Sequence, residues 1–125
     1  MTNASQIAER YIDVWNETDP ARRNVMLAKG WSEDASYIDP VMKGEGHQEI
    51  SELIGAVHER FPGFRFALDG RVDSHGDRIR FSWALGPDSD PEMIKGTDFA
   101  TTEDGLLKSV TGFLDKVPES AAKGP

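Results

Sequence analysis

The chain has no cysteine among its 125 residues. Disulfide bonds, thiolate catalysis and cysteine-ligated metal centres are therefore excluded. The three histidines, His47, His58 and His75, do not have the spacing of metal ligands. We therefore expect no metal site, and we expect His58 and His75 to lie at the surface. His47 either lines the mouth of a pocket or only helps a helix to begin.

Long apolar stretches and positive charge are also scarce. No apolar run reaches membrane-spanning length, and residues 1–10 lack the apolar centre of a signal peptide. The 22 acidic residues outnumber the 14 Lys and Arg, which gives a net charge of −8. Because like charges repel, nucleic acids and anionic membranes are poor partners for such a chain. The sequence therefore predicts a cytoplasmic protein that binds neither.

The chain does show a clear change of hydrophobic period along its length. Helical spacing predicts three helices, over 5–16, 20–30 and 47–60. A short strand and then a period of two predict five strands, over 35–39, 64–68, 79–85, 93–102 and 106–114. Helices followed by antiparallel strands are typical of an α+β domain.

This order of elements is compatible with a cone but does not by itself give the shape. A strongly curved, mostly antiparallel sheet wrapped around three helices would form a cone with one open end and an enclosed pocket. We expect residues 1–117 to form this single domain and residues 118–125 to form a loose polar tail.

Tyr11 is the first of three candidate site residues that lie far apart in the chain. It shares one helix face with Ile7, Val14 and Trp15, so its ring should point inward and its hydroxyl needs a partner. Taken alone, it is more simply a core tyrosine bonded to a backbone carbonyl.

Asp39 is the second candidate, at the end of a predicted strand and directly before Pro40. A residue before proline is pushed toward extended geometry, which would place its carboxyl at the rim of a pocket. Asp-Pro pairs also begin turns, and taken alone the turn is the stronger interpretation.

Asp98 is the third candidate, inside the apolar segment 94–100. A buried carboxyl in a strand is costly unless it is paired or neutral. By alternation Asp98 shares a face with Gly96 and Ala100, whose small size leaves space around it. That face either lines a cavity or is open to solvent.

Three segments together resemble a known family. Arg10-Tyr11-Ile12, Tyr37-Ile38-Asp39-Pro40-Val41 and Gly96-Thr97-Asp98-Phe99 occur in the order and spacing of the ketosteroid isomerase branch of the nuclear transport factor 2-like superfamily. The chain is also similar to the small SnoaL-like proteins of that superfamily. The resemblance implies the cone-shaped fold, a homodimer and a site without a cofactor.

The resemblance also implies catalytic roles. Asp39 matches the general base, Tyr11 matches a hydroxyl donor to the enolate oxygen, and Asp98 matches an aspartic acid that is kept protonated. The predicted substrate-binding residues are apolar and come from helices and strands: Trp15, Ile54, Val57, Phe66, Phe81 and Trp83.

The chain departs from the isomerases at two places. Ile54 stands where their third helix carries a supporting tyrosine, and the bulk of Phe81 and Trp83 reshapes the apolar lining. These differences weaken a steroid as the substrate more than they weaken proton-transfer chemistry.

The leading hypothesis is therefore an isomerase that moves a double bond in an apolar unsaturated ketone. A non-catalytic module for ligand binding or dimerisation and a SnoaL-like polyketide cyclase are the alternatives. Exposed Phe and Leu side chains on the outer sheet face would fit a homodimer. An epoxide hydrolase is disfavoured, because the strand arginines that could serve it are predicted to point outward: Arg65, Arg71, Arg78 and Arg80.

Overall fold

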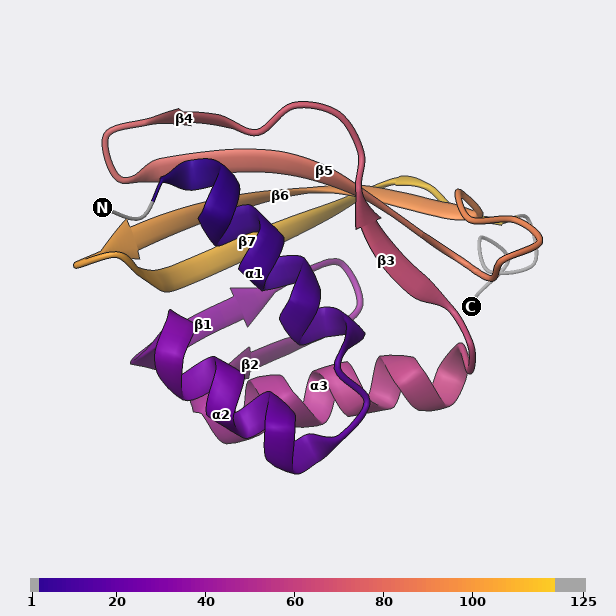
Figure 1. Ribbon diagram of the computed structural model, residues 1–125, viewed down its shortest axis with the longest axis horizontal. Helices are drawn as coiled ribbons and strands as arrows, with labels where there is room; N and C mark the ends of the chain where they lie inside the picture. Colours follow the sequence, from indigo (N-terminus) through magenta and orange to yellow (C-terminus); the bar gives the residue numbers. More distant parts are fainter. Residues whose placement is uncertain (1–2, 119–125) are drawn as a thin grey trace.

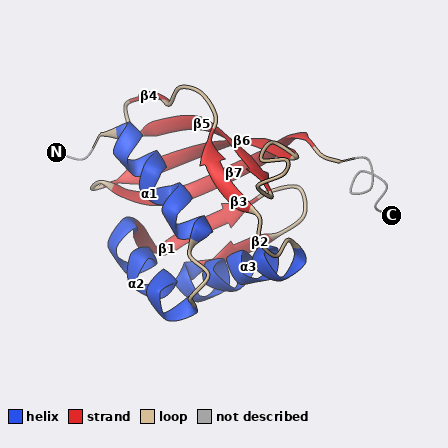
Figure 2. Cartoon of the chain, turned by 45° about the vertical axis from the view of Figure 1, so that its right-hand side comes forward, coloured by secondary structure: helices blue, strands red, loops and turns tan. Residues whose placement is uncertain are grey.

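The computed structural model describes residues 3–118, so most of the predicted tail lies outside the described residues. Within this part, three helices pack on a curved, mostly antiparallel sheet of seven strands that is not closed (Figures 1 and 2). The helices are α1 (Ala4–Asn16), α2 (Pro20–Gly30) and α3 (Gly46–Arg60). The α+β class and the helical spacing predicted from the sequence are confirmed.

Local sequence signals set the ends of the first two helices. Asn3 and Gln6 form a reciprocal capping box at the start of α1. The Asp19 carboxylate accepts a hydrogen bond from the Ala21 N–H at the start of α2, and Pro20 occupies the first turn. These caps fix where α1 and α2 begin.

The sheet has the order β2-β1-β7-β6-β5-β3, and β4 also pairs with β5. Its strands are β1 (Trp31–Ile38), β2 (Lys43–Glu45), β3 (Arg65–Leu68), β4 (Asp73–His75), β5 (Arg78–Gly86), β6 (Ile94–Glu103) and β7 (Leu106–Lys116). β1 and β7 are parallel, and the other pairs are antiparallel. Figure 1 shows β6 and β7 in the middle of this sheet.

Three strand assignments differ from the sequence prediction. β2 and β4 were not predicted, because three residues are too few to show alternation. β1 begins at Trp31 rather than at residue 35. Exposed Glu33 and Asp34 break its alternation there, and its pairing with β7 shifts register between Trp31 and Ser36.

Alternation along β6 separates an inner from an outer face of the sheet. Gly96, Asp98 and Ala100 are buried under the helices, whereas Phe99 is 45% exposed on the opposite face. A Cβ atom at Gly96 would come within 2.2 Å of the Trp83 ring on β5. Only glycine therefore leaves room for the indole ring against β6.

None of the helices in the described part of the chain is long and apolar enough to cross a membrane.

Candidate active site

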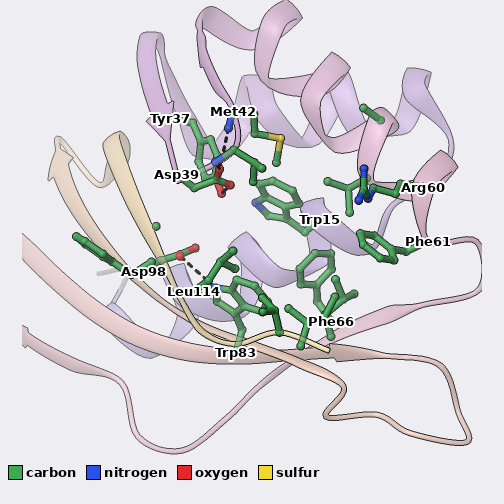
Figure 3. A pocket seen from close by; sticks show the side chains of 18 of the residues that line it. Trp15, Tyr37, Asp39, Met42, Arg60, Phe61, Phe66, Trp83, Asp98 and Leu114 are labelled. Carbon is green, nitrogen blue, oxygen red and sulfur yellow. Dashed lines mark hydrogen bonds between the residues drawn. The ribbon is translucent and has the colours of Figure 1, made fainter. Parts of the chain in front are cut away.

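A cavity of about 380 Å³ opens between the helices and the inner face of the sheet (Figure 3). Its walls are mostly aromatic and aliphatic, and its volume falls in the range of small-molecule sites. Lining residues come from α1, β1, α3 and the strands β3, β5, β6 and β7. The cavity includes all three candidate site residues, Tyr11, Asp39 and Asp98.

Tyr11 and Asp98 meet in the deepest part of this cavity. The Tyr11 hydroxyl donates to Asp98 Oδ2 at 2.5 Å, and the two side chains are 2% and 1% exposed. The helix face predicted for Tyr11 and the inner strand face predicted for Asp98 therefore point at each other. Asp98 lines the cavity and is not on a solvent-exposed face.

Trp83 holds the other oxygen of the same carboxyl. Its indole N–H donates to Asp98 Oδ1 at 3.0 Å (Figure 3). An indole nitrogen can only donate, so Oδ1 accepts; a proton of the neutral acid on Oδ2 could in turn be donated to the Tyr11 oxygen. Among the described residues, no Lys or Arg forms a salt bridge with Asp98.

Burial raises the pKa of Asp98 to about 6, against an ordinary value of 3.8. The hydrogen bonds from Tyr11 and Trp83 act in the opposite direction, and the negative charges of Asp39 and Asp115 raise the pKa further. Burial also raises the pKa of Tyr11, so its phenol keeps its proton. The deep pair is thus a neutral donor facing an acid that changes charge close to pH 6.

Asp39 lies at the rim, where it makes both kinds of contact that the sequence left open. Its Oδ1 accepts from the N–H groups of Val41 and Met42 at 2.8 and 2.9 Å, which closes a turn. Its Oδ2 accepts from the Tyr37 hydroxyl at 2.6 Å (Figure 3). The turn therefore fixes the position of a carboxyl that also lines the cavity.

Gly112 on β7 shows how close the two carboxyls are. A Cβ atom at this position would lie 2.8 Å from Asp98 Oδ1, 3.3 Å from Asp39 Cβ and 3.4 Å from the Tyr37 hydroxyl. Any larger residue would fill the gap between the two acids. The strands β1, β6 and β7 thus bring Asp39, Tyr37 and Asp98 around Gly112, where the backbone carries no side chain.

The predicted substrate-binding residues divide into two groups. Trp15, Val57, Phe66 and Trp83 line the cavity. Ile54, on α3, is fully buried in the core and does not line the cavity. Phe81 is also in the core, because it packs edge-on against the Tyr11 ring at 4.9 Å, so it supports Tyr11 from behind. The prediction that Ile54 and Phe81 contact substrate is corrected accordingly.

Two features of the site were missed in the sequence. Tyr37 was not named as a site residue, although it lies two residues before Asp39 and therefore on the same strand face. Arg60 and Phe61 at the end of α3 also line the cavity, and the guanidinium lies 5.6 Å from the Phe61 ring centroid. The break at Pro62-Gly63 indicated only that the helix ends there.

The histidines lie outside the cavity wall. His47 contacts the carbonyls of Trp31 and Ser32 through Nε2, so it ties the start of α3 to β1. His58 was predicted to be a surface residue and is half-buried: its Nε2 is 2.6 Å from the Trp15 carbonyl, and its Nδ1 is buried. In residues 3–118 no group of three or more His, Asp or Glu could hold a metal ion.

Comparison with known proteins agrees with this geometry. The family described as the SnoaL-like domain matches residues 8–110. The chain belongs to the SnoaL-like family, and its fold is that of the nuclear transport factor 2-like proteins. A search of curated proteins found no match.

Three solved structures illustrate the similarity. A protein from Agrobacterium tumefaciens strain C58, proposed to be an isomerase of the SnoaL-like family, is 41% identical, with a TM-score of 0.87 over 92% of this chain and 99% of that one. A proposed ketosteroid isomerase from Kribbella flavida shares the fold at 23% identity and a TM-score of 0.67, over 90% and 78% of the two chains. A protein from Catenulispora acidiphila with the ketosteroid isomerase-like fold, in complex with trimethylamine, is 16% identical, with a TM-score of 0.72 over 88% and 85%.

The raised pKa of Asp98 predicts a pH-dependent stability effect. A carboxyl with a folded-state pKa above its unfolded value loses its stabilising contribution as the pH rises from about 4 through 6. Asn at position 98 can accept from Trp83 and donate to Tyr11, as the neutral acid does. We expect Asp98→Asn to raise the free energy of unfolding at pH 8 by on the order of 2–3 kcal/mol, and to change it little at pH 4.

Urea unfolding at the two pH values measures this effect. Asp88→Asn, which removes an exposed loop carboxylate, is the matched control and should change stability little at either pH. A gain of equal size at pH 4 and pH 8, or a loss at pH 8, would contradict the assignment of Asp98 as a buried acid without a counter-charge.

Proposed function

We propose that this protein is an acid–base enzyme that moves a carbon–carbon double bond in a small apolar unsaturated ketone through an enolate, without a cofactor. The observation that carries the proposal is the buried Tyr11–Asp98 pair, which faces the Asp39 carboxylate across Gly112 in an otherwise apolar cavity. A base and an electrophilic donor on opposite sides of one small space are what this reaction requires.

Asp39 would act as the base. Its Oδ2 already accepts from Tyr37 but keeps a second lone pair, which can take the proton from the carbon beside the ketone. The electron pair of the broken C–H bond moves into the ketone, forming an enolate. Asp39 then returns the proton to the far end of the former double bond, so the carboxylate is regenerated.

Tyr11 would stabilise the enolate oxygen, and Asp98 would act through Tyr11. When Asp98 is neutral, its Oδ2 proton can be donated to the phenol oxygen, which leaves the Tyr11 O–H free to turn toward the substrate. A ligand that fills the cavity removes water from around Asp98 and favours this neutral form, because burial is the main cause of its raised pKa. A preorganised donor of this kind contributes on the order of 3 kcal/mol to transition-state stabilisation.

The comparisons support this reaction class without naming a substrate. The relative proposed to be an isomerase covers nearly the whole chain at 41% identity. A polyketide-cyclase reaction would use a similar carboxylate base on a bulkier, anionic substrate. Two carboxyls in a cavity of about 380 Å³, in a chain of net charge −8, disfavour such a substrate, although the Arg60 guanidinium in the cavity wall acts in the opposite direction.

A second candidate function is the binding of a small alkylammonium ion. Aromatic rings beside carboxylates are typical of sites for such cations. Here the cavity wall combines both, with the rings of Tyr11, Trp15, Tyr37, Phe61, Phe66 and Trp83. The structure with trimethylamine makes this candidate specific enough to test. Binding of such a cation without turnover would be one form of the non-catalytic ligand-binding module.

The first kinetic prediction concerns the base. Asp39→Asn should lower kcat for a cyclic β,γ-unsaturated ketone about 10²–10⁴-fold, because the amide cannot take the proton. Ultraviolet absorbance of the conjugated product gives the rate, and Asp88→Asn in an exposed loop should leave it unchanged. Equal background rates in the wild type and Asp39→Asn would support the non-catalytic function instead.

The second prediction separates the two candidate ligands by the sign of their pH dependence. The isomerase needs neutral Asp98, so kcat/KM should fall about tenfold per pH unit above the pKa of about 6. Binding of trimethylammonium needs an ionised carboxyl, so its affinity should rise over the same range. Calorimetric titrations at pH 5, 6, 7 and 8 follow the cation, and Asp98→Asn should remove both pH trends.

We also propose that two copies of the chain pair through the outer face of the sheet. Phe99 and Phe113 pack edge-on there with ring centroids 5.7 Å apart, and both are about half exposed. Their neighbours carry hydroxyls, such as Thr97, Thr101 and Ser109. The two rings therefore form a small apolar patch bordered by polar groups, including the Asp115 carboxylate that accepts from Thr97, as is common at protein interfaces.

A test of the pairing is the mass in solution. We expect light scattering to give a dimer for the wild type and a monomer for Phe99→Asp, because a carboxylate at the centre of the interface would be buried without a partner. Val25→Asp is the matched control, since Val25 is an exposed apolar residue on α2, away from this face. A monomeric wild type would contradict the proposal.

A further inference from the structure

Trp15 carries a buried donor that the mechanism above does not use. Its side chain is 3% exposed, and its indole N–H has no hydrogen-bond partner among the described residues. Buried indole N–H groups usually find an acceptor, because leaving one unpaired costs stability. The buried N–H of Trp15 therefore lacks the acceptor that would offset the cost of its burial.

The position of Trp15 suggests that a bound ligand supplies this acceptor. It follows Tyr11 by four residues on α1, so both side chains leave the same face of the helix and their ring centroids are 6.1 Å apart. Both residues line the cavity, and in Figure 3 the ring nitrogen of Trp15 faces the side on which the Asp39 and Asp98 carboxyls lie.

Neighbouring rings hold Trp15 in this orientation. Tyr37 and Phe66 lie on it with centroid distances of 5.3 and 5.4 Å. The pKa of Tyr11 is raised by burial and by Asp98, whereas Trp15 acts in the opposite direction, as a donor close to the phenol oxygen does. The Trp15 N–H therefore lies near the Tyr11 oxygen at the same end of the cavity, but outside the geometry of a hydrogen bond to it.

We propose that the Trp15 N–H donates to the same ligand oxygen as Tyr11, so that the site recognises an oxygen with two free lone pairs. A ketone or enolate oxygen meets this requirement, and so does a phenolate. An ammonium ion or a hydrocarbon does not, because neither can accept a hydrogen bond. The inference rests on the proposed function for the choice of oxygen ligand and makes Trp15 part of its binding site.

Trp31 provides a matched control for this role. Its indole N–H is also buried without a partner among the described residues, but Trp31 stacks on the Tyr11 ring and lines a different cavity, between α1, α2 and the β6–β7 turn. Trp15→Phe and Trp31→Phe therefore remove the same chemical group from two places, of which only the first faces the candidate site.

The experiment follows the indole N–H signals by NMR with tryptophan labelled with nitrogen-15. The chain has three tryptophans, so three signals are expected, and loss of one signal in each Trp→Phe variant assigns them. The probes are β-naphthol, which carries the required oxygen, and β-methylnaphthalene, which has the same shape without it. We expect β-naphthol to move the Trp15 signal downfield and β-methylnaphthalene to leave it close to its original position.

Affinity gives the second measurement. Trp15→Phe should weaken β-naphthol binding about tenfold and leave β-methylnaphthalene binding unchanged, whereas Trp31→Phe should affect neither. An unmoved Trp15 signal, an equal loss for both probes in Trp15→Phe, or no saturable binding of β-naphthol would overturn the inference. These outcomes do not depend on turnover. A shifted Trp15 signal in a protein that leaves the unsaturated ketone unchanged would refute the isomerase and keep this inference.

Discussion

The hydrogen bond between the Tyr11 phenol and the Asp98 carboxyl joins the first helix to the middle of the sheet. It buries an ionisable group in a wall of aromatic and aliphatic side chains with no cation against it among the described residues. Because solvent is excluded there, the acid changes charge near pH 6 rather than near 4. The cavity, the choice between a neutral and a cationic ligand, and the possible chemistry all depend on that one desolvated contact.

Much of this arrangement could be predicted from residue periodicity. Helical spacing placed Tyr11 on the buried face of α1, and alternation with Gly96 and Ala100 placed Asp98 on a face with free space. The turn at Asp39 followed from its proline. What periodicity could not supply was the register between strands, which decides that Trp83 lies over Gly96 and reaches Asp98 Oδ1. That pairing depends on a contact between side chains from two strands, and neither strand encodes it alone.

The errors have the same origin. Ile54 and Phe81 are apolar and point inward, as expected, but an inward side chain can face either the cavity or the packed core. His58 lies on a helix flank that the sequence cannot distinguish from a fully solvent-facing one, and contact with the Trp15 carbonyl leaves it half-buried. β2 and β4 are too short for a pattern and exist because longer strands offer them partners. In each case tertiary contacts, rather than local preference, decided the outcome.

The hydroxyl and carboxyl groups of Tyr11, Asp39 and Asp98 gather on one side of the cavity, and Figure 3 shows Arg60, Phe61 and Phe66 away from them. Selectivity is therefore unevenly distributed over a bound molecule. Its oxygen-bearing head must match fixed donors, and a wrong head group leaves them unpaired. Its tail meets mostly hydrocarbon, with the Arg60 guanidinium beside Phe61 as an exception, and there one methylene changes affinity by about 1–3 kcal/mol. Such a pocket would discriminate strongly between functional groups and weakly between carbon skeletons. It would therefore accept a series of related compounds rather than a single metabolite.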